Sequence, residues 1–284
     1  MQGDKFFMKK NLTIIFLVVV ILVSFYYIYK KSGQREEIVV EEKNLPVILN
    51  ENEELVTADS FETKVLNPNN AYVKFDVRYP SFKKADDNFN LEIENVIKGQ
   101  IDEHMVISKD SWQARYDTQT EGENIKETPE KEEDKFAFFS HFEIIQSNST
   151  YISFVLKYGG FSGGAHGYEN IVSYNYDVKN QKIINLKDLF SNDKDYLKIL
   201  SDQSRVQLKK QFTTISEEEK KSSDPEALKE SIKSMIEMIE SGTEQNEENF
   251  KVFTFTPDKI KIYFGQYQVG PYAIGMPEVE IDKN

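Results

Sequence analysis

The sequence contains no cysteine, which excludes disulfides, thiolate metal ligands, cysteine nucleophiles and a lipoprotein anchor. Histidine is also scarce, with three residues at positions 104, 141 and 166, so a zinc site would have to gather them from separate elements. The chain has no Gly-x-Ser-x-Gly or His-Glu-x-x-His motif. We therefore expect a protein that is not an enzyme and that has no catalytic residues, no cofactor and no metal site.

Positive charge is under-represented. Lys and Arg total 35 against 48 Asp and Glu, which gives a net charge of -13. Such a charge repels phosphate backbones, so we expect no nucleic-acid partner and favour a basic protein or a cationic ligand. Hydrophobic residues make up 39% of the chain, with 20 Phe and 15 Tyr, which is enough to build large folded cores.

One long uncharged run, residues 11–29, follows Lys5, Lys9 and Lys10 and ends in several aromatic residues. Its length and its aromatic end are typical of a membrane-spanning helix. A cleaved signal peptide is the alternative, but bulky aromatics and Lys30 stand where a small-residue cleavage site would be needed. We expect an uncleaved signal anchor in the cell membrane, with residues 1–10 in the cytosol and the bulk of the chain extracytoplasmic.

The remaining chain is predicted to form an acidic linker at 30–57, a smaller α+β subdomain at 58–130 and an α+β domain at 131–284. Alternating residues predict a strand at 71–79 that ends at Pro80, and an apolar stripe predicts a helix that begins at Asp86 and ends before Trp112. His104 lies at the edge of this stripe, where a partly buried structural role is expected. The overall prediction is an α+β fold in which helices pack on an antiparallel sheet. Its further elements are a hairpin at 136–145 and 151–158, a strand at 171–178, a helix after Asp193, a helix that Asp224 caps and Pro225 begins, and closing strands at 250–255, 260–264 and 278–281.

The stretch from Tyr158 to Tyr168 is the most distinctive, because five of its eleven residues are glycine and its one ionisable group besides the two tyrosines is His166. We interpret it as a loop between two strands, with backbone conformations that favour glycine. A second loop rich in Gly, Pro and Tyr covers 266–276. The aromatic and imidazole side chains of the two loops are the candidate ligand-binding residues: Tyr158, Phe161, His166, Tyr168, Tyr267 and Tyr272.

Four motifs in fixed order carry a resemblance to a known family. They are Gly-Gly-Ala-His-Gly at 163–167, Tyr-Asn-Tyr-Asp at 174–177, Leu-Lys-Asp-Leu-Phe at 186–190 and Tyr-Gln-Val-Gly-Pro-Tyr-Ala-Ile-Gly at 267–275. This series resembles the C-terminal domain of the RsiV family of anti-sigma factors, which also accompanies the deacetylase PdaC. The resemblance implies a mixed α and β fold, an extracytoplasmic role and, as in RsiV, lysozyme as a ligand. The ten residues before the apolar run are too few for a sigma-factor interface, so we expect no anti-sigma activity.

Three functions remain open at this point. The first is an anchored binding or sensor-like module for a basic protein such as lysozyme, or for a cell-wall glycan. The second is an envelope hydrolase centred on His166, with Asp177 or Asp188 as its partner. The third is a non-catalytic scaffold of an envelope complex, which an exposed apolar patch would favour.

Overall fold

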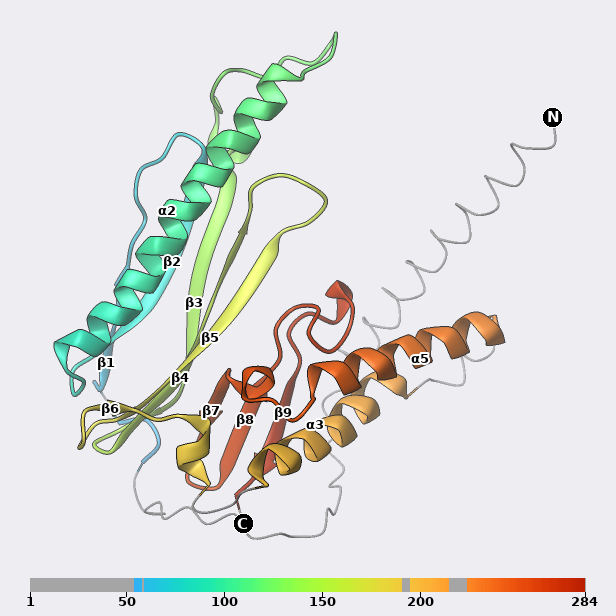
Figure 1. Cartoon of the computed structure of the whole chain (residues 1–284). Helices are drawn as coiled ribbons and strands as arrows, with labels where there is room; N and C mark the ends of the chain where they lie inside the picture. Colours follow the sequence, from blue (N-terminus) through green and yellow to red (C-terminus); the bar gives the residue numbers. More distant parts are fainter. Residues whose placement is uncertain (1–53, 58, 191–194, 215–223, 284) are drawn as a thin grey trace. The chain divides into compact units, whose positions relative to one another are not determined.

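The computed structural model describes residues 54–57, 59–190, 195–214 and 224–283 (Figure 1). The expected tail at 1–10, the apolar run at 11–29, most of the linker at 30–57 and the predicted cap Asp193 lie outside these residues. Within the described part of the chain, no helix combines the length and the hydropathy that crossing a bilayer requires. The chain divides into two compact units, which are described separately. The larger unit contains 45–197, 246–263 and 278–284, and the smaller unit contains 198–245 and 264–277.

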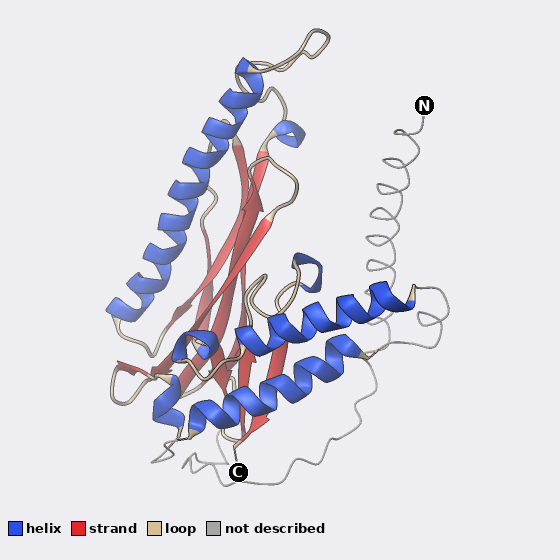
Figure 2. Ribbon diagram, turned by 45° about the vertical axis from the view of Figure 1, so that its right-hand side comes forward, coloured by secondary structure: helices blue, strands red, loops and turns tan. Residues whose placement is uncertain are grey.

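A six-stranded sheet in the order β1-β2-β3-β4-β5-β6 organises the larger unit (Figures 1 and 2). Its neighbours are antiparallel except for β2 and β3, which are parallel. Parallel neighbours need a long crossover, and helix α2 (Asp87–Asp117) supplies it and lies along one face of the sheet. The sheet is therefore mixed, where an antiparallel sheet was predicted. The strands are β1 (Phe61–Val65), β2 (Val73–Phe82), β3 (Phe136–Ser147), β4 (Tyr151–Phe161), β5 (Tyr168–Asp177) and β6 (Lys182–Ile183).

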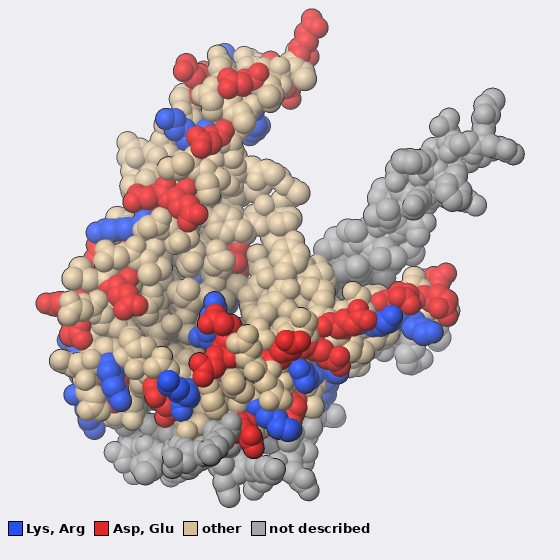
Figure 3. Space-filling view, in the orientation of Figure 1, with Lys and Arg blue, Asp and Glu red and all other residues tan. Residues whose placement is uncertain are grey.

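Helix α2 begins where the sequence predicted, because Asp86 is its N-cap and accepts a hydrogen bond from the backbone N–H of Phe89 at 2.9 Å. Its buried stripe runs from Phe89 to Trp112. The helix is longer than predicted, so Trp112 lies within it rather than after it. The indole is buried and its Nε1 donates to the carbonyl of Lys126 at 3.0 Å. On the outer face of α2, carboxylates and cations are interspersed (Figure 3).

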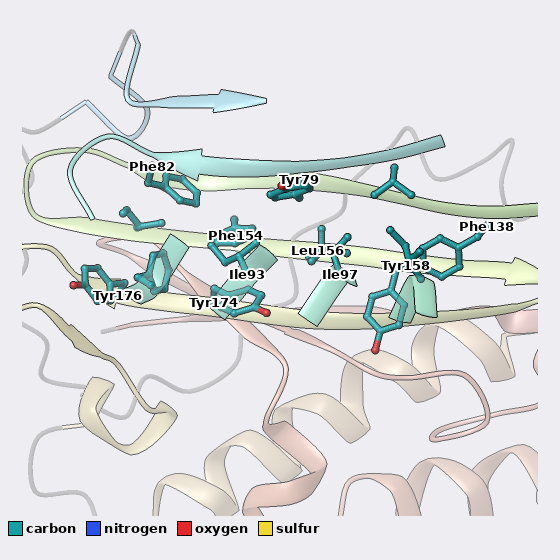
Figure 4. Packing of buried hydrophobic residues seen from close by; sticks show 14 of the residues in the cluster. Tyr79, Phe82, Ile93, Ile97, Phe138, Phe154, Leu156, Tyr158, Tyr174 and Tyr176 are labelled. Carbon is teal, nitrogen blue, oxygen red and sulfur yellow. The ribbon is translucent and has the colours of Figure 1, made fainter. Parts of the chain in front are cut away.

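The core lies between α2 and the sheet (Figure 4). In strands β2 to β5, alternate residues contribute to this core, as the period-2 patterns predicted. Phe154 stacks on Tyr174 with ring centroids 5.0 Å apart, and Phe89 of the helix stacks on Tyr176 at 4.4 Å. Aromatic pairs of this kind add to the stability that buried area provides. The core members are Val73, Val77, Tyr79, Phe82, Phe89, Ile93, Ile97, Ile101, Phe138, Ile152, Phe154, Leu156, Tyr158, Tyr174 and Tyr176.

Two tyrosines of β5 hold α2 at two points. The hydroxyl of Tyr176 donates to the carboxylate of Asp86, and the hydroxyl of Tyr168 is 2.9 Å from Nδ1 of His104. The 18 residue steps from Asp86 to His104 rise about 27 Å along the helix, and the eight steps from Tyr168 to Tyr176 rise about 26 Å along the strand. Because these lengths match, both hydrogen bonds form at once and fix the helix along the strand.

Strand β2 continues through Pro80, although the proline was predicted to end it. Pro80 pairs with Thr63 of β1, whereas the pairing of β2 with β3 ends at Val77 and Ser140. Beyond Val77 the strand has no partner on its other side, so a residue without a backbone N–H is tolerated there.

The expected boundary between residues 130 and 131 falls in the connection between α2 and β3. Because β2 and β3 pair in one sheet, the segments before and after this point share one core. The closing strands β7 (Phe253–Phe255), β8 (Lys259–Tyr263) and β9 (Glu278–Asp282) form a separate antiparallel sheet within the larger unit. Strand β7 contacts β4 and β5, where Ser153 accepts from the backbone N–H of Phe255 at 3.0 Å. Short 3-10 helices are η1 (Glu132–Asp134), η2 (Leu186–Leu189), η3 (Glu247–Phe250) and η4 (Tyr272–Ile274).

Two helices, α3 (Tyr196–Thr213) and α5 (Pro225–Gly242), provide most of the smaller unit. The predicted start of α5 is confirmed, because Asp224 accepts hydrogen bonds from the backbone N–H groups of Glu226 and Ala227. Gly242 is the last residue of the helix, and its missing side chain allows a close approach, because a Cβ there would lie 2.0 Å from the carbonyl oxygen of Gln268.

Candidate functional site

The glycine-rich turn, defined as residues 162–167, connects the long strands β4 and β5 at one end of the sheet. Gly163 and Gly164 have φ angles of +99° and +96°, a region that residues with a Cβ rarely adopt. The prediction that this loop uses glycine-specific conformations is confirmed for these two residues.

Gly159 and Gly160 belong to β4, although the sequence interpretation placed them in the loop. Their role is close approach rather than turning. A Cβ on Gly159 would lie 2.1 Å from the carbonyl oxygen of Tyr168, and one on Gly160 would lie 2.3 Å from that of Ala137 and 2.7 Å from Cε1 of His104. The turn is therefore shorter than the stretch from Tyr158 to Tyr168.

Two of the candidate residues are exposed to solvent here, one at the end of β4 and one within the turn. Phe161 is 41% exposed, and its ring packs edge-on against Phe136 with centroids 6.0 Å apart. His166 is exposed, and its Nδ1 is 2.8 Å from the carbonyl oxygen of Gly167, so an Nδ1–H would donate to it. An exposed apolar ring at the end of β4 and an exposed imidazole within the turn thus lie five residues apart.

The other two candidates of this stretch, Tyr158 and Tyr168, lie in the two strands that the turn connects. Tyr158 was predicted to bind a ligand, but its side chain is buried in the core among the residues drawn in Figure 4. Tyr168 is half-buried and its hydroxyl is held by His104. Burial raises the pKa of Tyr168 to about 12, and Glu103 adds to this effect, so the hydroxyl stays protonated as a hydrogen-bonding group.

Tyr267 and Tyr272 belong to the smaller unit, where their rings lie 5.8 Å apart at an angle of 43°. Tyr267 is 54% exposed and has a φ of +65°, a conformation unfavourable for a bulky side chain. Gln268 holds this turn, because its Oε1 accepts from the N–H of Gly265 at 3.0 Å and its Nε2 donates to the carbonyl of Gly242 at 3.1 Å. The two tyrosines form an aromatic pair in which Tyr267 is exposed and Tyr272 is half-buried.

His104 is the residue whose importance the sequence did not reveal. Its side chain is 1% exposed, and Nδ1 contacts the hydroxyl of Tyr168, 64 residues further along the chain. The position at the edge of the apolar stripe indicated partial burial of His104. No local signal indicated its contact with Tyr168, which depends on the fold.

The hydrolase centred on His166 lacks its predicted partners. Asp177 lies at the far end of β5 from the turn, and the nine residue steps from Tyr168 span about 30 Å. Asp188 is held in a capping box with Asn185. Among the described residues, no group of three or more His, Asp or Glu side chains is arranged to hold a metal ion.

Two family models match successive segments of the chain. Residues 66–169, which run from before β2 to just past the glycine-rich turn, match the family model for the deacetylase PdaC. Residues 187–284 match the model of a protein family of unknown function, DUF3298. The chain carries a PdaC-like and a DUF3298-like segment.

A curated relative is the peptidoglycan-N-acetylmuramic acid deacetylase PdaC of Bacillus subtilis (strain 168), which is 27% identical over 143 residues. The match covers 50% of this chain but 27% of PdaC, so this chain spans about a quarter of that enzyme's length. Solved structures of DUF3298 family members from Bacteroides fragilis NCTC 9343 and Pseudomonas aeruginosa PAO1 are also similar. The first is 15% identical with a TM-score of 0.48, covering 78% of this chain and 89% of the other. The second is 12% identical with a TM-score of 0.42, covering 79% and 91%.

Proposed function

We propose that this chain is a non-catalytic binding module of the bacterial cell envelope, and that the glycine-rich turn recognises a cell-wall glycan. The observation that carries the proposal is the exposure of Phe161, the last residue of β4, and of His166 in the turn, whose two ends are fixed by packing. An apolar ring can lie on the face of a sugar while an imidazole hydrogen-bonds its hydroxyl or amide groups.

The relationship to PdaC supports this ligand. That enzyme is named for its action on peptidoglycan, and the segment matched by the PdaC model contains the whole turn. The resemblance is confined to about a quarter of PdaC, so a shared glycan environment is proposed rather than a shared reaction. The same environment is consistent with the proposed anchor at 11–29 and an extracytoplasmic location.

The test is binding of the full-length chain, purified in mild detergent, to insoluble peptidoglycan. We expect Phe161→Ala and His166→Ala each to weaken binding about tenfold, which corresponds to a loss of ~1.4 kcal/mol. His141→Ala is the matched control for the imidazole, because His141 is exposed on the sheet and stacks on Phe139 instead. Val65→Ala, at a 63% exposed residue of β1, is the control for the apolar side chain. Equal retention of all four variants would disprove a role for the turn.

A basic protein such as lysozyme is the second candidate ligand. The net charge of -13 favours a cationic partner, and the four ordered motifs resemble RsiV, whose corresponding domain binds lysozyme. The pair of exposed Tyr267 and half-buried Tyr272 suits a protein partner, because tyrosine is enriched at the centres of such interfaces.

The scaffold hypothesis has less support among the described residues. Helix α2 has exposed apolar residues at Leu91, Val106 and Ile107. Leu91 and Val106 are fifteen residues apart, which is about 22 Å along a helix, so they do not form the contiguous patch that a large permanent interface needs.

A further inference from the structure

We infer that His104 is a positioning residue for the glycine-rich turn, holding both ends of the turn at the separation that ligand binding requires. The inference rests on the binding role proposed above for that turn. Helix α2 would then contribute to recognition through the turn, because none of the proposed ligand contacts lies on the helix itself.

The contacts of His104 with the two ends of the turn carry the inference. Gly160 and Tyr168 are paired in register, and theirs is the last pair of β4 and β5 before the turn. Nδ1 of His104 is 2.9 Å from the hydroxyl of Tyr168, and a Cβ on Gly160 would lie 2.7 Å from Cε1 of the same ring. One imidazole therefore contacts the strand that enters the turn and the strand that leaves it.

The imidazole is itself held firmly. It is 1% exposed, and the ring of Phe138 lies 5.1 Å from it between centroids. Burial lowers the pKa of His104, and the carbonyl of Ala137 opposes this effect only in part. The imidazole is therefore neutral at neutral pH and makes one defined hydrogen bond to Tyr168.

The titratable groups near His104 come from each element packed against it. Tyr168 of β5 and Tyr158 of β4 both have a raised pKa through burial, to which Glu103 of α2 contributes. Ser108, one helical turn after His104, is buried and has no hydrogen-bond partner among the described residues. Among the described residues, no carboxylate forms an ion pair with His104, so a protonated imidazole would carry an uncompensated charge in a buried site.

A turn held in one conformation loses less conformational freedom when it binds a ligand, which strengthens binding without any new contact. Replacing His104 by Phe, or Tyr168 by Phe, removes the hydrogen bond and leaves a ring in place. His104→Asn keeps a polar atom near the position of Nδ1, so it serves as the conservative variant.

Two measurements on the full-length chain test the inference. The first is amide hydrogen exchange of residues 161–168 without ligand, and the second is peptidoglycan binding between pH 4 and pH 8. We expect His104→Phe and Tyr168→Phe each to speed amide exchange in the turn and to weaken binding several-fold. The double variant should lose no more than either single variant, because both substitutions remove the same hydrogen bond. His104→Asn should exchange as slowly as the unaltered chain. We also expect binding of the unaltered chain to fall at low pH, and this fall should be smaller in His104→Asn.

The two proposals fail in different ways. Unchanged exchange and unchanged binding in both Phe variants would overturn the role of His104 and leave the proposed function intact. Faster exchange in a chain that binds no peptidoglycan would leave the positioning contact standing and refute the glycan ligand. Unchanged exchange and binding in His104→Phe, together with losses in His104→Asn, would show that the imidazole only fills space, which also overturns the inference.

Discussion

Adding a methyl group to a glycine, as in a change to alanine, has opposite effects on stability at two positions of the larger unit. At Gly160 it would collide with the carbonyl of Ala137 and with the ring of His104, whereas at Gly99, on the exposed side of α2, nothing lies within 4 Å. Overpacking of this kind destabilises proteins by about 1–3 kcal/mol, and Ala in place of an exposed helical Gly stabilises by about 0.5–1 kcal/mol.

We therefore expect Gly160→Ala to lower the free energy of unfolding and Gly99→Ala to raise it. Urea denaturation followed by tryptophan fluorescence measures both, because Trp112 is the only tryptophan and lies in α2. A stabilised Gly160→Ala variant would show that β4 does not approach β3 and α2 as closely as described.

At the scale of the elements, the N-cap of α2 makes the attachment of the helix depend on pH. The hydrogen bond from Tyr176 is the main cause of the lowered pKa of Asp86, and the N–H of Phe89 adds to it. A carboxylate whose pKa is lower in the folded than in the unfolded state stabilises the fold at pH values above its unfolded pKa, which is 3.8 for Asp86. This stabilisation is lost as the pH falls through the pKa of the folded state.

Asp86→Ala should accordingly lower the Tm by several degrees at pH 7 and by less at about pH 3. Thermal denaturation at the two pH values gives the comparison, with Asp87→Ala as the control, because Asp87 follows the cap and is exposed. The same fall in Tm at both pH values would contradict the assignment of the ionised carboxylate as the cap.

Several elements could be predicted from the sequence because their signals are local. The apolar stripe and Asp86 predicted the start of α2, and Asp224 with Pro225 predicted the start of α5. The parallel pairing of β2 with β3 could not be predicted, because it depends on contacts between residues about 63 apart, such as Val77 and Ser140. Glycine content alone did not distinguish Gly159 and Gly160, which allow close packing, from Gly163 and Gly164, which turn the chain. The burial of Tyr158 and the contact of His104 with Tyr168 depend on the same long-range pairing.

For the whole molecule, the net charge of -13 predicts that binding to a basic protein and binding to a glycan depend differently on ionic strength. Attraction between this chain and a basic protein is screened over about 10 Å at 0.1 M salt, so binding to lysozyme should weaken steeply between low and moderate salt. Binding to an uncharged glycan through Phe161 and His166 should change little over the same range. Calorimetric titrations at two salt concentrations decide between them, and salt-independent binding of lysozyme would contradict an electrostatic attraction.

The matched hydrogen bonds of Tyr176 with Asp86 and of Tyr168 with His104 also constrain how the length of this chain can vary. Deleting one residue between Asp86 and His104 would rotate the imidazole by about 100° around the helix axis, away from the sheet. Changes of length in the polar connection at 118–131 leave both bonds untouched, since it lies beyond the two contacts. Insertions and deletions in natural variants of this architecture should therefore collect in that connection and avoid the first five turns of the helix.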